Sequence, residues 1–220
     1  MSTGGGQEFE YQFKESEYDR KRILNWLKSN GKLVHKRTKY RIKYLYEENN
    51  KSFIRVRDEA GQLTLTRKDI SVQPPLEDEI KLGKEETFET AVVFARAVAP
   101  PKSIELTTEK YREKWKITKG GIDCHEVVFD EWAGLPPYME IDCSNQKSLE
   151  KTIEELGLED AKYFTKGAFD YYEELYGIDR KILFRTNLNF ADILKNIGEH
   201  IKRNEKLLKK LQKKYKEKDY

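Results

Sequence analysis

Residues 52–68 read SFIRVRDEAGQLTLTRK, and this stretch decides the fold class of the chain. Its first half alternates apolar and basic residues: Ile54, Arg55, Val56, Arg57. Successive side chains of a strand point to opposite faces, so this alternation predicts a strand with one apolar and one charged face. The turn sequence Glu59-Ala60-Gly61 follows, and residues 62–68 return as a second strand. The stretch therefore predicts an antiparallel hairpin.

The same period-two pattern extends over most of the chain. Strands are predicted at 8–14, 39–47, 52–58, 62–68, 76–82, 104–117, 122–132 and 137–143, and helices at 16–30, 84–98 and 145–157. Except at the helices, the connections are too short for parallel crossovers. We therefore expect about eight mainly antiparallel strands with helices inserted between them.

The charged residues are sorted by strand. The chain is 37% charged, with 42 basic and 39 acidic residues, so neither sign dominates as it does in proteins built mainly to bind nucleic acid. Acidic residues occupy the first, fifth and last strands, whereas basic residues occupy the middle strands. Like charges two residues apart lie ~7 Å from each other and repel. A bound polyanion and a bound cation would relieve this repulsion.

Two arrangements of the charged faces are possible. They could simply face water, as in most antiparallel sheets with one buried face. Alternatively, amphipathic helices could cover the apolar faces from outside, so that the charged faces line the interior. An eight-stranded barrel encloses enough space for one small ligand. We expect the second arrangement: an α+β fold with a closed antiparallel eight-stranded β-barrel, or tunnel, and helices packed outside.

Such an interior suits a polyphosphate and its counter-ion. Arginine presents a planar fork that matches phosphate oxygens, and lysine adds a point charge. Carboxylates with few His or Cys neighbours suit Mg²⁺ or Mn²⁺, which also share phosphate oxygens as ligands. The charged residues therefore predict a phosphate-bearing polyanion with a divalent cation, such as Mg²⁺ or Mn²⁺.

Five short motifs, in this order, resemble the triphosphate tunnel metalloenzyme (CYTH) superfamily over about residues 8–177. This superfamily holds class IV adenylate cyclases, thiamine triphosphatases, and inorganic and RNA triphosphatases. The motifs are Glu8-Phe9-Glu10-Tyr11-Gln12, Ile54-Arg55-Val56-Arg57, Leu65-Thr66-Arg67-Lys68, Lys110-Tyr111-Arg112, and 129–142 (FDEWAGLPPYMEID). Each motif is weak alone, but their order and strand parity together make a specific pattern.

The resemblance implies a role for each matching residue. The expected metal ligands are Glu8, Glu10, Asp130, Glu140 and Asp142. The expected phosphate-binding residues are Arg55, Arg57, Lys68, Lys110 and Arg112. Glu77 and Glu79 match an acidic strand that assists the metal or a water, and Lys14 is a further catalytic candidate. A charge satisfied by a neighbour across the barrel is the structural alternative for each residue.

Gln12 departs from the superfamily pattern, which has lysine at this place in Glu-x-Glu-x-Lys. Lys14 lies on the same face and could replace that lysine. Alternatively, the true register is Glu10, Gln12 and Lys14, so that an amide replaces a carboxylate ligand. Because an amide is a poorer ligand for a hard cation, this register would weaken metal binding or catalysis.

These features predict a metal-dependent hydrolase that removes the terminal phosphate of inorganic triphosphate, a nucleotide or an RNA 5′ end. The alternatives are a class IV-type adenylate cyclase, a non-catalytic triphosphate-binding protein and a sheet scaffold that assembles through its tail. The sequence lacks an apolar run near ~20 residues and a signal-peptide core, so we expect a cytoplasmic protein with no membrane partner. The two cysteines, Cys124 and Cys143, fit a reducing compartment.

Three regions are expected along the chain: a flexible start at 1–7, the tunnel domain at 8–180 and a helical extension at 181–220. Within 188–218 apolar residues recur at spacings of three and four, as in a short heptad seam: Leu194, Ile197, Ile201, Asn204, Leu208, Leu211, Tyr215. This seam predicts either a helix packed on the barrel or homo-oligomerisation with Asn204 setting the register.

Overall fold

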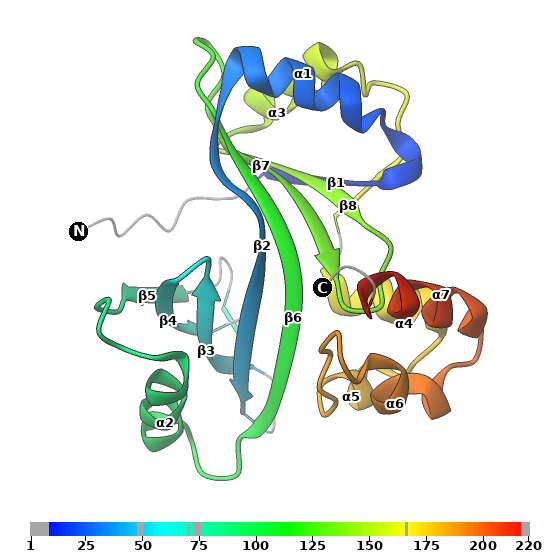
Figure 1. Cartoon of the computed structure of the whole chain (residues 1–220). Coiled ribbons are helices and arrows are strands. Elements are labelled where there is room, and N and C mark those ends of the chain that lie inside the picture. Colours follow the sequence, from blue (N-terminus) through cyan, green and yellow to red (C-terminus); the bar gives the residue numbers. More distant parts are fainter. Residues whose placement is uncertain (1–8, 48–50, 70, 73–75, 166, 217–220) are drawn as a thin grey trace. The chain divides into compact units, whose positions relative to one another are not determined.

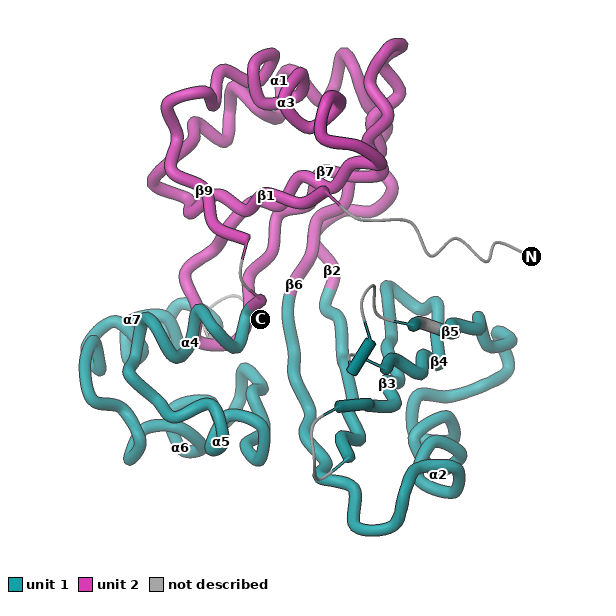
Figure 2. Tube along the Cα trace, turned by 180° about the vertical axis from the view of Figure 1, so that it is seen from behind, with its two compact units in different colours: residues 1–5, 39–110, 168–220 teal, residues 6–38, 111–167 magenta. Residues whose placement is uncertain are grey.

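The computed structural model describes residues 9–47, 51–69, 71–72, 76–165 and 167–216, without the side chains of Glu77 and Lys216. The chain divides into two compact units (Figure 2). Unit 1 contains residues 39–110 and 168–216, and unit 2 contains residues 9–38 and 111–167. Each unit is described by itself.

Unit 2 packs two helices on one face of its strands (Figure 1). Its elements are β1 (Phe9–Lys14), α1 (Arg20–Asn30), β7 (Cys124–Trp132), β8 (Tyr138–Cys143), α3 (Gln146–Leu156) and β9 (Tyr163–Phe164). Asp19 and Asn145 accept hydrogen bonds from the first-turn amides of α1 and α3, which fixes where both helices begin. Ile23 and Leu27 of α1 join the buried core with apolar residues from the strands and from α3. The opposite face of these strands carries the charged residues.

In unit 1, α2 (Phe88–Val98) covers one face of β3 (Ser52–Glu59) and β4 (Gln62–Asp69). Ala91, Val92 and Ala95 of α2 are buried against Ile54 and Val56 of β3. The β3–β4 turn uses Ala60 and Gly61, both with positive φ, as a two-residue hairpin turn requires. The next strand, β5 (Leu76–Lys81), pairs with β4 in antiparallel register.

Two long strands, β2 (Gly31–Tyr46) and β6 (Ile104–Ile117), run through both units. All nine strands form one sheet in the order β5-β4-β3-β2-β6-β7-β8-β1-β9. Within the described residues, β5 and β9 are the two ends of this order, so the sheet is open. The α+β class and the antiparallel sheet are therefore confirmed, whereas closure into an eight-stranded barrel is not.

The predicted strand at 39–47 is eight residues too short at its start. Gly31 was predicted only to end a helix, but it also begins β2. A Cβ atom at Gly31 would lie 2.9 Å from the carbonyl oxygen of Lys116, so the close approach of the two strands requires glycine. Between Lys32 and Thr38 the exposed side chains are mainly polar, and this composition hid the strand.

The remaining helices of unit 1 are α4 (Ala168–Tyr176), α5 (Arg180–Leu183), α6 (Ile193–Ile197) and α7 (Glu205–Lys216). Phe169 and Phe184 form ring contacts with Tyr44 and Tyr46 of β2. Tyr44 lies directly opposite Arg55 in the β2–β3 ladder, so both side chains point to the same face. Helix α4 and Phe184, which directly follows α5, therefore contact the sheet on its arginine-bearing face. The sequence predicted helices only on the apolar faces, so this contact was not expected.

The heptad seam predicted in 188–218 is not one helix. The chain leaves helical geometry between α6 and α7, where Asn204 adopts a left-handed conformation with φ of 61°. Its side-chain amide donates to the carbonyl of Leu175 at 2.7 Å. Leu208, Leu211 and Tyr215 are buried within this helical region. The alternative of a helix packed on the rest of the chain is therefore closer to the structure, and homo-oligomerisation stays a prediction.

Cys124 and Cys143 lie directly opposite each other in the β7–β8 ladder and are joined as a disulfide. This pairing could not be predicted from the sequence, because a separation of 19 residues is not a characteristic spacing for a disulfide. In the described part of the chain, no helix combines the length and apolar character needed to cross a bilayer.

Candidate functional site

The predicted phosphate-binding arginines lie side by side on one face of β3. Arg55 and Arg57 are two residues apart, so the strand geometry directs both away from the face that α2 covers. Arg55 Nη2 lies 3.3 Å from Thr66 Oγ1 on β4 and 3.5 Å from Glu79 Oε2 on β5. Arg57 Nη2 donates to the same Glu79 oxygen at 3.2 Å. We call Arg55, Arg57, Thr66 and Glu79 the arginine cluster.

Glu79 links the three strands of the arginine cluster. Thr66 Oγ1 donates to Glu79 Oε2 at 2.8 Å, so a hydroxyl and two guanidinium groups converge on one carboxylate oxygen. A phosphate group has the same charge sign and more acceptor oxygens. Glu79 therefore holds the arginines in an arrangement that a phosphate could also satisfy.

Two further predicted residues lie in unit 1. Lys68 of β4 is half-buried and lies directly opposite Glu77 of β5, on the arginine-bearing face. Lys110 of β6 is buried, with its ammonium group 5.7 Å from the centre of the Tyr40 ring. Lys68 therefore belongs to the same β4–β5 strand pair as Thr66 and Glu79.

The predicted metal ligands of unit 2 lie on the charged face of β1 and β8. Glu10 is directly opposite Asp142, and Gln12 is directly opposite Glu140. The Gln12 side-chain amide nitrogen donates to Glu10 and also to Glu140 Oε2, the latter at 3.3 Å. Gln12 is 95% buried, and its Oε1 accepts no hydrogen bond from the described residues. One amide therefore holds two carboxylates together.

Arg112 forms the centre of the same face. Its guanidinium group donates to both carboxylate oxygens of Asp130 at 2.6 Å, and it also contacts Glu126 at 3.3 Å and Glu140 at 3.4 Å. Burial alone would lower the pKa of Arg112, but Asp130 and Glu140 raise it above its ordinary value. Arg112 therefore stays charged. We call Glu10, Gln12, Arg112, Asp130 and Glu140 the carboxylate cluster.

The carboxylate cluster fits a divalent cation only in part. Among the described residues, no three Asp, Glu, His or Cys side chains lie together as a ready-made metal site. Glu10 and Glu140 converge, and Mg²⁺ commonly takes only one or two protein carboxylates together with phosphate oxygens and waters. These two residues could hold such a cation if Gln12 moved. Asp130 already has both oxygens engaged by Arg112, and Asp142 lies opposite Glu10.

Three further predicted residues, Glu8, Glu77 and Lys14, lie outside both clusters or outside the described part of the chain. Glu8 lies outside the described residues, and so does the side chain of Glu77. Lys14 is half-buried at the end of β1, opposite Tyr138 and on the same face as Gln12. Burial raises the pKa of Tyr138, with further contributions from Asp130 and Glu140, so its hydroxyl stays protonated beside these carboxylates.

Sequence reasoning missed two members of these faces. Thr66 lies inside a quoted motif, and its position two residues before Lys68 places it on the arginine-bearing face. Glu126 lies four residues before Asp130 on β7 and contacts both Arg112 and Lys114. Strand parity identifies both residues, but parity alone does not separate a cluster member from a solvated side chain.

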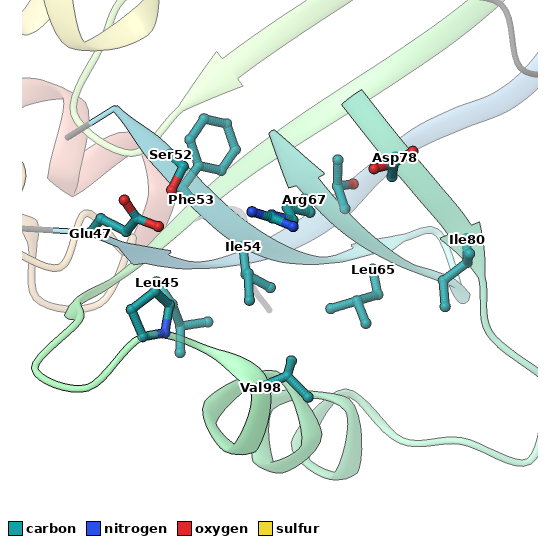
Figure 3. Close-up of a pocket in the computed structure, with 12 residues that line it drawn as sticks. Leu45, Glu47, Ser52, Phe53, Ile54, Leu65, Arg67, Asp78, Ile80 and Val98 are labelled. Carbon is teal, nitrogen blue, oxygen red and sulfur yellow. The ribbon is translucent and has the colours of Figure 1, made fainter. Parts of the chain in front are cut away.

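A cavity of about 440 Å³ lies on the other face of unit 1 (Figure 3). Leu45, Ile54 and Leu65 contribute apolar side chains to its lining, together with Ile80 and Val98. Its lining residues include none of the predicted site residues. Thr66 of the arginine cluster also lines this cavity, whereas Arg55, Arg57 and Glu79 do not.

No protein-family model and no curated protein matches the sequence. Solved structures do match. A conserved hypothetical protein from Pyrococcus furiosus is 19% identical with a TM-score of 0.51, and the match covers 74% of this chain and 98% of that chain. A proposed adenylate cyclase from Vibrio parahaemolyticus is 11% identical with a TM-score of 0.53, over 76% of this chain and 98% of that chain.

At such low identities the likeness is one of fold. The chain therefore shares its fold with these two proteins.

Proposed function

We propose that this protein is a metal-dependent triphosphatase that hydrolyses the terminal phosphate of a triphosphate substrate. The observation that carries the proposal is the arginine cluster, in which two arginines and a threonine hydroxyl converge on one oxygen of Glu79. Convergent donors of this kind bind a phosphate group in the same way. The fold likeness and the carboxylate cluster support the proposal.

In the proposed reaction, Arg55 and Arg57 exchange Glu79 for oxygens of the substrate phosphates. Water attacks the terminal phosphorus, the bond to the bridging oxygen breaks, and orthophosphate leaves with the shortened polyphosphate. The released Glu79 carboxylate accepts a proton from the attacking water. Lys68 and Lys110 add positive charge for the phosphates, and Lys14 and Glu77 keep the supporting roles that the resemblance implies.

A divalent cation such as Mg²⁺ or Mn²⁺, when bound, would supply positive charge to the transferring phosphoryl group. The resemblance implies five carboxylate ligands for it: Glu8, Glu10, Asp130, Glu140 and Asp142. Of these, Glu10 and Glu140 would hold the cation, because both already converge on the Gln12 amide. Gln12 would then change its hydrogen bonds. Asp130 keeps Arg112 in position, and Arg112 holds Glu140.

Phosphate release from inorganic triphosphate, ATP and a 5′-triphosphate RNA, each with Mg²⁺ or Mn²⁺, tests the proposal. Arg57→Ala and Glu140→Ala should each lower turnover at least 100-fold. Arg41→Ala is the matched control, because Arg41 forms ion pairs with Asp58 and Glu89 on the face that α2 covers. Equal turnover by Arg57→Ala and Arg41→Ala would show that the arginine cluster does not bind substrate.

Adenylate cyclase activity is the second candidate function, because the Vibrio parahaemolyticus structure is named as a proposed adenylate cyclase. Cyclisation attacks the α-phosphorus of ATP with the ribose 3′-hydroxyl and releases diphosphate. The same assay distinguishes the two reactions, since cyclic AMP appears in one and orthophosphate in the other. Tight binding of triphosphate without either product would indicate a binding protein, in line with Gln12 in place of the signature lysine.

A further inference from the structure

The last described helix, α7, is far more basic than the rest of the chain. Residues 202–214 hold seven Lys or Arg and one Glu, a net charge of +6, whereas the whole chain carries +3. The remainder is therefore net negative, at −3. The positive charge of this protein is concentrated on one short segment.

The exposed lysines of α7 form one stripe. Lys206, Lys209, Lys210 and Lys213 follow one another at spacings of three, one and three residues, which places them on the same side of an α-helix, and all four are exposed. Lys209 also pairs with Glu205 at 2.6 Å. Like charges three or four residues apart destabilise a helix by about 0.2–0.5 kcal/mol per pair. The stripe therefore does not stabilise α7 as a packing element.

The opposite side of α7 is already buried. Leu208, Leu211 and Tyr215 are at most 7% exposed, and the Tyr215 ring lies 4.6 Å from that of Phe190. A helix that binds a membrane surface inserts its apolar side chains between the lipids. Because those of α7 are engaged within the protein, only its charge is available to a partner, and this favours a polyanionic strand over a lipid bilayer.

The helices of this region also reach the arginine-bearing face of unit 1. Phe169 of α4 contacts the ring of Tyr44, which lies opposite Arg55, and Phe184 contacts Tyr46. In turn, α7 is anchored beside α4 through Asn204, whose amide donates to Leu175. The lysine stripe and the arginine cluster therefore belong to one compact unit.

We propose that the lysine stripe Lys206, Lys209, Lys210 and Lys213 binds the backbone of a single-stranded RNA whose 5′ triphosphate is the substrate. This inference rests on the proposed function and names its substrate class. Lysines bind phosphates as point charges without reading sequence, so the stripe would bind RNA of any sequence.

The test measures fluorescence anisotropy with a labelled 20-nucleotide RNA that carries a 5′ triphosphate, over a range of salt concentrations. The variant K206Q/K209Q/K210Q/K213Q keeps helix-forming side chains and removes four charges. Its affinity should fall at least tenfold at low salt. Its slope of log affinity against log salt should become shallower by about 3, since each phosphate contact to a single strand contributes about 0.7.

The matched control is K21Q/K28Q/K32Q/K36Q, which removes four exposed lysines from unit 2. It should bind RNA within twofold of the wild type, and circular dichroism should show both variants folded. Equal loss of affinity in the two variants would mean that only net charge matters, and this overturns the proposal. The proposal is also overturned if the wild-type protein binds vesicles with 30% phosphatidylserine but does not bind the RNA.

Hydrolysis of inorganic triphosphate separates this inference from the proposed function. The stripe variant should retain wild-type hydrolysis of inorganic triphosphate and lose turnover of the RNA at sub-saturating concentrations. Hydrolysis of inorganic triphosphate without any RNA binding would leave the proposed function intact and remove the RNA assignment. RNA binding that depends on the stripe, without hydrolysis of either substrate, would support the RNA-binding surface and remove the proposed triphosphatase function.

Discussion

Arg112 and Asp130 form a two-point ion pair, in which Nε and Nη2 each lie 2.6 Å from one carboxylate oxygen, and both residues are buried. Arg112 was predicted to bind phosphate, and Asp130 was predicted to hold metal. The structure shows each already satisfied by the other. Removing one partner of a buried pair leaves an uncompensated charge, so this pair is first of all a structural element of unit 2.

Arg112→Gln should lower the free energy of unfolding by roughly 3–5 kcal/mol, because Asp130 would remain buried without its partner. Arg96→Gln is the matched control. Arg96 forms the same two-point contact with Glu105, at 2.9 and 2.8 Å, but its side chain is 51% exposed, and exposed pairs contribute at most about 1 kcal/mol. Urea denaturation measures both values. Similar losses in the two variants would contradict the burial argument.

Much of the fold could be predicted from alternation alone. Strand β6 matches its prediction from 104 to 117, because apolar and charged residues alternate along its second half. Helix α3 ends at Gly157, whose left-handed φ of 61° is typical of a helix terminus. The regions that failed are those without a periodic signal. The start of β2 is polar, and the tail seam is interrupted at Asn204 by a backbone conformation that its spacing does not reveal.

Less of the site could be predicted, because strand parity gives the face of a side chain but not its partner. Parity correctly placed Arg55 and Arg57 on one face. It could not show that Glu79 would bind both of them, since β4 separates β3 from β5 in the sheet. The burial of Asp130 also depends on neighbouring strands that are distant in sequence.

Gln12→Glu should turn the amide that links Glu10 and Glu140 into a third carboxylate. In chelator, repulsion among the three should lower the melting temperature well below that of the wild type. Adding Mn²⁺ should restore it, because a ligand present at 100 times its Kd stabilises the folded state by about 2.7 kcal/mol. Differential scanning fluorimetry with and without 1 mM Mn²⁺ measures both effects.

Gln12→Met is the control for this experiment, since it keeps the length of the side chain but cannot hydrogen bond. The loss of both donated hydrogen bonds should lower the free energy of unfolding by about 1–3 kcal/mol. Mn²⁺ should raise the melting temperature of Gln12→Met less than that of Gln12→Glu. If Mn²⁺ stabilises Gln12→Glu no more than Gln12→Met, then Glu10 and Glu140 are not the core of a cation site.

Glu105 gives the protein a predictable response to acid. Hydrogen bonds from Arg96, together with Lys43 at 2.8 Å, lower the pKa of Glu105 from 4.5 to about 2, against the effect of its partial burial. Because the folded-state pKa is lower than the unfolded one, this residue contributes stability above pH 4.5 and loses it as the pH falls toward 2.

Glu105→Gln should therefore flatten the dependence of the unfolding free energy on pH between 4.5 and 2, measured by urea denaturation at several pH values. Arg96→Gln removes the main cause of the lowered pKa and should flatten the same window in part. An unchanged slope in both variants would show that Glu105 does not contribute to the acid response.

Asn204 distinguishes the two interpretations of the tail. As a seam residue it would set the register of an oligomer, so its replacement would change the molecular mass in solution. As the structure places it, Asn204 joins α6 to α7 with a φ of 61° and donates to the Leu175 carbonyl. Asn204→Ala should then lower the free energy of unfolding by roughly 2 kcal/mol, from the lost hydrogen bond and the strained backbone, with no change in mass.

Asn204→Gly separates the two contributions, because glycine adopts a positive φ without strain but cannot donate the side-chain hydrogen bond. It should lower the free energy of unfolding by only about 1 kcal/mol, and thus less than alanine does. Light scattering measures the molecular mass of both variants. A change in mass with little loss of unfolding free energy would favour the oligomeric seam. At constant mass, a greater loss of unfolding free energy for alanine than for glycine can arise only from the left-handed backbone at this position.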